Sequence, residues 1–144
     1  MAYGRRQAAI AEEALRHLQL ALSTIFALGC SIGAASAQDA AAGENTFKIC
    51  KACHQIGEGA KNVIGPELNG VVGRKAGTVA DYSYSDANKN SGLTWDEATL
   101  KDYLKDPRAK VPGTKMAFPG LKRDADIDNV IAYLKQFDAD GKKL

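Results

Sequence analysis

Sulfur and imidazole side chains are scarce in this chain. Its 144 residues contain three cysteines, two histidines, two methionines and one tryptophan. A chain of this length forms one ordinary domain, so every functional group must serve a single core. With so few candidate ligands, the sequence predicts one site.

An excess of charge of either sign is also missing. Lysine and arginine total 19 residues against 17 acidic ones, and 45% of the chain is apolar and 25% charged. This composition excludes intrinsic disorder and a multi-spanning membrane protein. Without a basic surplus, no nucleic-acid partner is indicated, and any electrostatic partner must be met by a local patch.

Residues 1–37 differ from the rest. Three arginines and an uncharged, mostly apolar stretch over 18–32 precede Ala35-Ser36-Ala37, a small-x-small pattern that signal peptidase reads. We predict a signal peptide over 1–37, cleaved after Ala37, and a periplasmic mature domain over 38–144. A retained membrane anchor stays open, although polar residues interrupt the apolar stretch, as does lipidation at Cys30.

The segment 38–144 keeps two cysteines, one histidine and one methionine. Without the three arginines and two glutamates of the first 37 residues, 16 basic residues stand against 15 acidic ones. The mature chain is therefore close to neutral before any cofactor is counted.

Helical signals predict an all-α fold with three principal helices. Asp39 is a good N-cap for a first helix that continues through Phe47 to the cysteines. Thr94 and Glu97 form a capping box for a second helix, which Pro107 ends.

A third helix begins at Asp124 or Asp126 and closes before Gly141. Its apolar residues recur at three- and four-residue spacing: Ile127, Val130, Ile131, Leu134 and Phe137. No sequence repeat or strand-like alternation is visible.

The stretch 55–90 has no sustained period. It carries six glycines and one proline, and only a short helix over 85–90 is expected there. A loop of this size is uncommon inside a compact domain, because loops bury too little apolar surface to offset the entropy of ordering them. A large buried cofactor would resolve this conflict.

Cys50-Lys51-Ala52-Cys53-His54 is a C-x-x-C-H motif, typical of covalent haem attachment. The two thiols add to the porphyrin vinyl groups and the histidine binds the iron. A thioredoxin-like pair would need a βαβ setting, a zinc site would need two more ligands, and a disulfide would close a loop too tight to constrain much of the unfolded chain. The motif therefore favours haem c over these three alternatives.

Met116 is the one methionine of the segment 38–144 and lies in a loop with proline and glycine. A lone methionine is often core filler. In cytochromes the second axial position of the haem iron is filled by methionine or histidine, and no second histidine is present in the segment. From the residues alone, both readings of Met116 stay open.

The chain from Gly43 to about Lys135 resembles the class I c-type cytochromes of the mitochondrial type, most of all their soluble periplasmic relatives in bacteria. The separation of 62 residues between His54 and Met116 fits this family. The segments that carry the resemblance are 43–47, 50–54, 65–70, 73–77, 82–90, 112–116 and 131–134. The resemblance implies a class I fold, with short helices and long loops around one haem, and Met116 as the second axial ligand.

The resemblance also implies roles around the haem. The Pro66 carbonyl would accept a hydrogen bond from the non-ligating nitrogen of His54 and raise its basicity. The haem propionates would accept hydrogen bonds from Arg74, Tyr84, Trp95 and Thr114. Tyr103 and Asn88 would lie near the methionine ligand and tune the potential. Phe118 would shield the edge of the haem.

The implied function is one-electron transfer, without enzyme activity, by a monomer that shuttles between membrane redox complexes. These would be a cytochrome bc complex and a terminal oxidase or photosynthetic reaction centre. Basic residues implied to meet the partners are Lys61, Arg108, Lys115, Lys122 and Arg123. Glu44 and Ile49 depart from the lysines of mitochondrial members. The alternative is a peroxidase-like or gas-binding haem protein with a labile sixth ligand.

Overall fold

A computed structural model describes residues 38–144. The predicted signal peptide over 1–37, its cleavage after Ala37, and the open alternatives of an anchor or of lipidation at Cys30 all lie outside the described residues.

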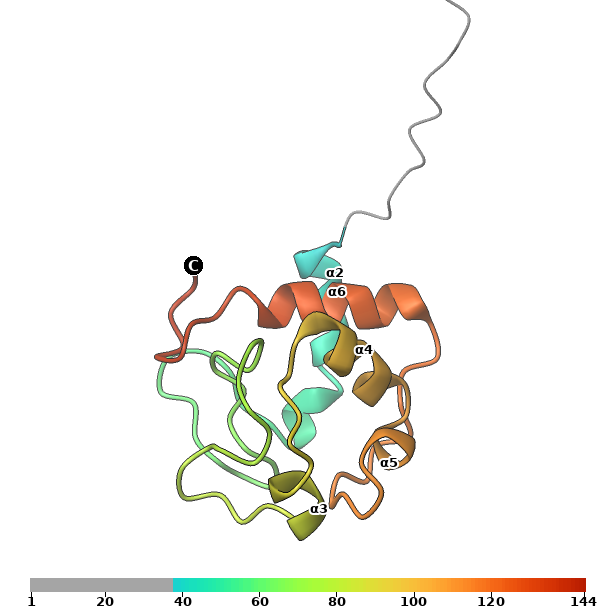
Figure 1. Cartoon of the computed structure of the whole chain (residues 1–144). Helices are drawn as coiled ribbons and strands as arrows, with labels where there is room; N and C mark the ends of the chain where they lie inside the picture. The colour runs from blue at the N-terminus through green and yellow to red at the C-terminus, as the bar shows by residue number, and fades with distance from the viewer. Residues whose placement is uncertain (1–37) are drawn as a thin grey trace, which may run out of the picture. The chain divides into compact units, whose positions relative to one another are not determined.

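The described part of the chain is helical, with long connecting loops (Figure 1). Three longer helices match the predicted principal ones: α2 (Ala40–Phe47), α4 (Glu97–Lys105) and α6 (Asp124–Leu134). The short helices are η1 (Cys50–Ala52), α3 (Asp86–Lys89) and α5 (Pro107–Lys110). Over residues 38–144 the only β-structure is two isolated bridges, and no helix there has the length and apolarity to cross a membrane.

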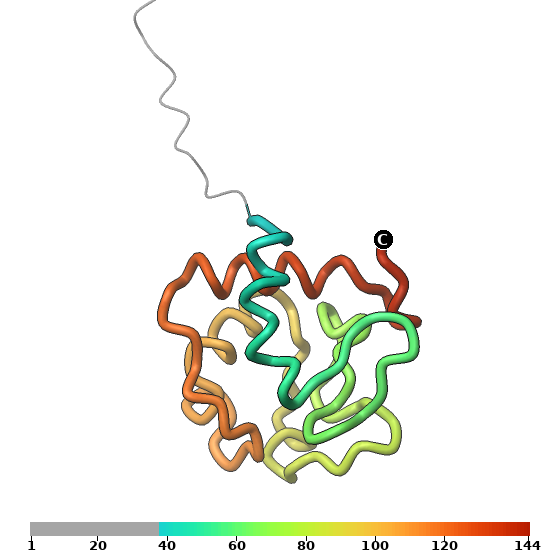
Figure 2. Tube along the Cα trace, turned by 180° about the vertical axis from the view of Figure 1, so that it is seen from behind, coloured from blue at the N-terminus to red at the C-terminus, as the bar shows by residue number. Residues whose placement is uncertain are grey.

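The first and last helices cross each other, as both views show (Figures 1 and 2). Asp39 caps α2 by accepting hydrogen bonds from the amides of Ala41 and Ala42. At the crossing, a Cβ added to Gly43 would lie 2.9 Å from the Cβ of Tyr133 and would clash with a carbonyl of α6. Glycine is thus required for the close approach that buries Phe47.

Two details at α4 differ from the sequence prediction. The N-cap is Asp96, which accepts from the Thr99 amide at 2.7 Å, so the predicted capping box beginning at Thr94 is wrong. Glu97 instead forms an ion pair with Lys135, at the end of α6. Thr94 and Asp96 are both acceptable N-caps and lie two residues apart, so the sequence alone does not separate them. In the structure Thr94 pairs with Lys75 in an isolated β-bridge, which holds Thr94 in extended backbone before the helix begins.

Pro107 does more than end α4. It occupies the first turn of α5, where its missing N–H costs nothing, and Asp106 caps that helix by accepting from two amides. This one-turn helix was not predicted, because the proline was interpreted only as the end of the preceding helix. It carries the chain from α4 into the loop that holds Met116.

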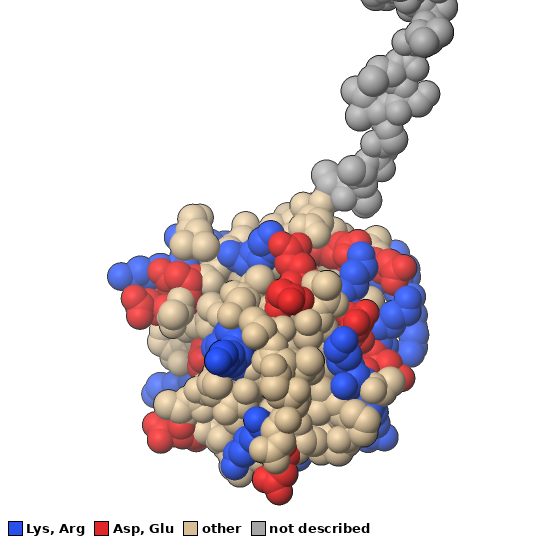
Figure 3. All heavy atoms as spheres, viewed as in Figure 1, with Lys and Arg blue, Asp and Glu red and all other residues tan. Residues whose placement is uncertain are grey.

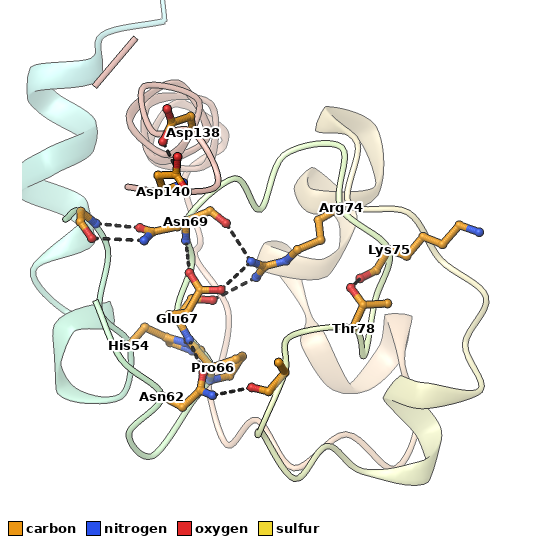
Figure 4. Close-up of polar contacts among 12 residues, drawn as sticks. His54, Asn62, Pro66, Glu67, Asn69, Arg74, Lys75, Thr78, Asp138 and Asp140 are labelled. Carbon is orange, nitrogen blue, oxygen red and sulfur yellow. Dashed lines mark hydrogen bonds and ion pairs between the residues drawn. The ribbon is translucent and has the colours of Figure 1, made fainter. Parts of the chain in front are cut away.

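The loop region 55–85 is ordered by polar side chains rather than by regular structure. Asn69 is buried, and its amide group both donates to and accepts from the backbone of Gly57, at 3.1 and 2.8 Å. Figure 4 shows this pair beside a second cluster around Glu67 and Arg74. These contacts give the long loop fixed positions from which it can line the molecule's interior.

Candidate functional site

A cavity of about 380 Å³ lies inside the helices and loops. Every residue predicted to hold a cofactor or its iron borders it: Cys50, Cys53, His54, Pro66, Arg74, Tyr84, Asn88, Trp95, Tyr103, Thr114, Met116 and Phe118. Much of the remaining lining is apolar and includes Leu68, Leu100 and Val130. Residues spread over more than 60 positions of the sequence thus converge on one apolar space with a few polar groups, the usual form of a cofactor site.

His54 is held in one orientation. Its Nδ1 lies 2.7 Å from the Pro66 carbonyl, and because a carbonyl can only accept, Nδ1 carries the proton and Nε2 is left as the ligating nitrogen. The ring packs on Gly65, where an added Cβ would lie 2.6 Å from Nδ1. Burial lowers the pKa of His54, against a smaller opposite effect of the Pro66 carbonyl. The imidazole is therefore kept neutral, the form that binds metals.

Cys50 and Cys53 are free thiols on the turn of η1. The Cys50 carbonyl accepts from the amides of Cys53 and His54, at 3.0 and 2.9 Å, so this turn sets the positions of all three side chains relative to one another. Burial, and then the neighbouring Cys53, raise the pKa of Cys50 to about 11. A raised pKa favours the protonated thiol, unlike the lowered pKa that activates the thiolate of a disulfide oxidoreductase.

The loop that carries Met116 is fixed by the hydroxyl of Thr114. This oxygen accepts from Asn88 Nδ2 at 3.2 Å and from the Met116 amide at 3.3 Å, and it shares a hydrogen bond of 3.1 Å with the Tyr103 hydroxyl. A hydroxyl has one donor and two acceptor positions, so these contacts fill its capacity. The predicted bond from Thr114 to a propionate stays a prediction and requires one of these contacts to be exchanged.

One buried polar atom in the cavity wall lacks a partner. Among residues 38–144, Asn88 Oδ1 is the only buried side-chain oxygen or nitrogen without a hydrogen bond. Leaving such a group unsatisfied costs about 1–3 kcal/mol, so a partner is expected in the cavity. Trp95 and Tyr103 also border the cavity and pack against each other with ring centroids 4.7 Å apart.

Arg74 combines two tasks. Its guanidinium donates to the Glu67 carboxylate at 2.8 Å and to the carbonyls of Asn69 and Glu67 at 2.7 and 2.9 Å. Of its five N–H donors these use three, and two remain for a propionate. The sequence prediction named Arg74 but missed Glu67 and Asn62, which support it and the neighbouring peptide. No residue pattern distinguishes these two from the other polar residues of the loop.

The residues that border the cavity fit a haem. His54, Met116 and the two cysteines border one mostly apolar space, and its wall also includes Asn88, which has an unpaired amide oxygen, and Arg74, which has two N–H donors unused within the chain. This is the set that a macrocycle with apolar faces, two acidic groups and an axially ligated metal requires.

Comparison with known proteins gives a consistent result. The cytochrome c family model matches residues 40–138. Cytochrome c-550 of Bradyrhizobium diazoefficiens is 68% identical over 103 residues, which are 72% of this chain and 76% of that protein. Cytochrome c2 of Blastochloris viridis is 56% identical over 119 residues, 83% of this chain and 94% of that protein.

Among solved structures, cytochrome c2 of Rhodospirillum centenum matches with a TM-score of 0.67 at 39% identity, covering 69% of this chain and 98% of its own. Cytochrome cH of Methylobacterium extorquens matches with a TM-score of 0.64 at 58% identity, covering 68% and 98%. The chain therefore belongs to the cytochrome c family, and it is an electron carrier with one covalently attached haem c, not an enzyme.

Proposed function

We propose that Cys50 and Cys53 form the two thioether bonds to the haem, and that His54 and Met116 are the two axial ligands of its iron. The observation that carries this assignment is the convergence of all four side chains on one cavity. The hydrogen bond from Nδ1 to Pro66 supports it further, because it leaves Nε2 of His54 as the nitrogen available for iron.

Haem c in this cavity supplies a one-electron iron couple. If His54 and Met116 both bind the iron, no coordination position would be open to a substrate, and the haem would serve only to accept and release an electron. The thioether of Met116 and the apolar lining favour the less charged ferrous state, because a buried positive charge is costly. We expect a midpoint potential that is high and positive for a cytochrome.

The hydrogen-bond partners of the cavity wall have separate roles in this proposal. Asn88 and Tyr103 fix the Met116 loop through Thr114, and the free oxygen of Asn88 is placed to hold an ordered water. Arg74, Tyr84 and Trp95 are assigned to the propionates. Phe118, at the border of the cavity and partly buried against the core, shields the haem edge.

The docking surface for membrane redox complexes is proposed beside the cavity. Ile49, Val63 and Ile64 are 55%, 48% and 75% exposed, and the first and third border the cavity. Apolar side chains that surround the point of electron exit allow a partner to approach without trapping water. Charges of both signs alternate around the rim of the face in Figure 3, so on that face no field of a single sign extends across the molecule.

The five basic residues predicted to meet partners differ in how free their charges are. Arg123 is bound to Asp126 in an ion pair, so it contributes least to an attraction. Lys115 borders the cavity and donates to the Ser83 carbonyl at 3.2 Å, which leaves its charge available. Lys61, Arg108 and Lys122 are exposed. We propose Lys115 as the principal electrostatic contact.

We further propose that the protein acts in the periplasm as a monomer, after removal of residues 1–37. Its donor and acceptor would be a cytochrome bc complex and a terminal oxidase or photosynthetic reaction centre. Mass measurement of the mature protein tests the first point: the expected mass is that of 38–144 plus one haem. A mass that includes residues 1–37 or a lipid at Cys30 would contradict it.

The ligand assignment is tested with the variant Met116→Ala, matured with its haem. We expect the midpoint potential to fall and carbon monoxide to bind the ferrous protein, which the wild-type protein should bind poorly. Asp86→Ala, a surface change on α3 away from the cavity wall, serves as the control and should change neither property. Rapid carbon monoxide binding by the wild-type protein would instead favour a gas-binding or peroxidase-like site.

A further inference from the structure

The peptide group between Pro66 and Glu67 is hydrogen-bonded on both of its sides. Its carbonyl accepts from His54 Nδ1 at 2.7 Å, and its N–H donates to Asn62 Oδ1 at 3.0 Å. The same asparagine donates from Nδ2 to the Ala80 carbonyl at 2.8 Å. Figure 4 shows His54, Pro66 and Asn62 gathered at one end of the loop network. A chain of three hydrogen bonds thus runs from the loop at 80 to the imidazole.

The position of Asn62 gives it influence over the imidazole. A peptide unit is planar and conjugated, so an acceptor placed on its N–H draws electron density toward the carbonyl oxygen. The Pro66 oxygen then becomes a stronger acceptor for the Nδ1 proton. A more strongly polarised Nδ1–H makes the opposite nitrogen, Nε2, a better electron donor to a metal.

We infer that Asn62 is a positioning residue for the iron: through the Pro66–Glu67 peptide it strengthens His54 as a donor and so lowers the midpoint potential of the haem. This rests on the proposed ligation by His54. Glu67 holds the other end of the same peptide, since its carboxylate accepts from the Asn69 amide at 2.6 Å and is bound by Arg74. These contacts hold the plane of the Pro66–Glu67 peptide in place.

The effect is small and has a definite sign. A change of 10–30% in the strength of one hydrogen bond to a polarised group alters the ferrous-to-ferric ratio by a factor of about 1.5 to 4. A factor of ten is 59 mV for one electron, so the expected shift is about 10 to 35 mV. Removing the Asn62 acceptor should raise the potential, because a weaker imidazole donor stabilises the ferric iron less.

Two variants separate the acceptor from the donor of Asn62, both measured in the haem-loaded protein. Asn62→Leu keeps the volume and removes both polar groups, and we expect the potential to rise. Asn62→Asp keeps the oxygen that faces the Glu67 amide and loses the donor to Ala80, and we expect no rise. In the ferrous protein, the Nδ1 proton resonance of His54 should move upfield in the leucine variant alone.

Asn69→Ala is the matched control, because the side chain of this loop asparagine makes one donor and one acceptor bond, both to Gly57. Its bonds to Glu67 and Arg74 come from the backbone and are retained in the variant. It should lower stability and leave the potential and the His54 proton unchanged. Equal rises in Asn62→Leu and Asn62→Asp, or an equal rise in Asn69→Ala, would show that loosening of the loop is responsible and would overturn the inference. Failure of His54 ligation itself would appear separately, as an altered ferric spectrum in the wild-type protein.

Discussion

Gly65 is the position where the packing around the axial histidine can be tested most sharply. It is buried, its φ is not positive, and an added Cβ would lie 2.6 Å from Nδ1 and 2.8 Å from Nε2 of His54. Real Cβ atoms do not approach so closely, and the ring cannot retreat without loosening its bond to Pro66. Gly65→Ala should therefore act on the site itself.

The magnitude follows from two opposing effects. Forcing a methyl group into a packed site costs about 1–3 kcal/mol. Replacing glycine lowers the entropy of the unfolded chain and returns about 0.4–1 kcal/mol where the backbone permits alanine. We expect Gly65→Ala to lose about 1–2 kcal/mol in the free energy of unfolding, measured by guanidinium denaturation of the haem-loaded protein. The midpoint potential should rise as the bond from Nδ1 lengthens.

Gly59→Ala provides the comparison. Gly59 has φ +75° and no atom within 4 Å of an added Cβ, so alanine there meets backbone strain but no neighbour. It should lose a similar stability of about 1 kcal/mol, since a left-handed conformation costs an L-residue about that much. Its potential and His54 proton resonance should match the wild type. A Gly65→Ala protein with wild-type potential and histidine resonance would refute the packing described for this site.

Three further predictions concern the core, the helix cap and the docking surface. Phe47→Ala, which empties a site that is 1% exposed at the helix crossing, should cost about 3–5 kcal/mol in guanidinium unfolding, and a loss below 1 kcal/mol would contradict the packing described. The hydrogen bond from the amide of Thr99 lowers the pKa of Asp96 in the folded protein below the value of 3.8 in the unfolded chain. The ionised Asp96 therefore stabilises the fold above pH 3.8, and this stabilisation is lost as the pH falls through the folded pKa. Asp96→Asn should therefore flatten the acid dependence of unfolding below pH 4, and an unchanged slope would exclude the cap as its source. Lys115→Gln should slow electron transfer to a purified bacterial cytochrome oxidase at low salt and converge with the wild type at high salt, whereas rates insensitive to salt in both proteins would argue against electrostatic steering.

The sequence predicted the features that depend on strong local signals. The Asp39 cap and the start of α6 at Asp124 each arise from neighbouring residues, and the structure confirms both. The predicted end of that helix just before Gly141 is wrong, because α6 ends at Leu134 and Phe137 lies beyond it. The C-x-x-C-H motif borders the cavity, and its role there remains a proposal. The place of the short helix α3 was also predicted, and in the structure Ser85 is its N-cap.

What the sequence did not predict depends on contacts between distant segments. The start of α4 at Asp96 instead of Thr94 is decided where the chain pairs with Lys75, outside the helix. Asn62 and Glu67 are ordinary loop residues until folding brings the loops at 57, 69 and 80 together. Polar networks of this kind have no sequence period, so their members emerge only from the folded chain.

Whether Met116 binds the iron opposite His54 can be decided from the absorption spectrum of the ferric, haem-loaded protein. We expect the weak far-red band of an iron–methionine sulfur bond in the wild type and its loss in Met116→Ala. Covalent haem without that band in the wild-type protein would show that Met116 is not a ligand.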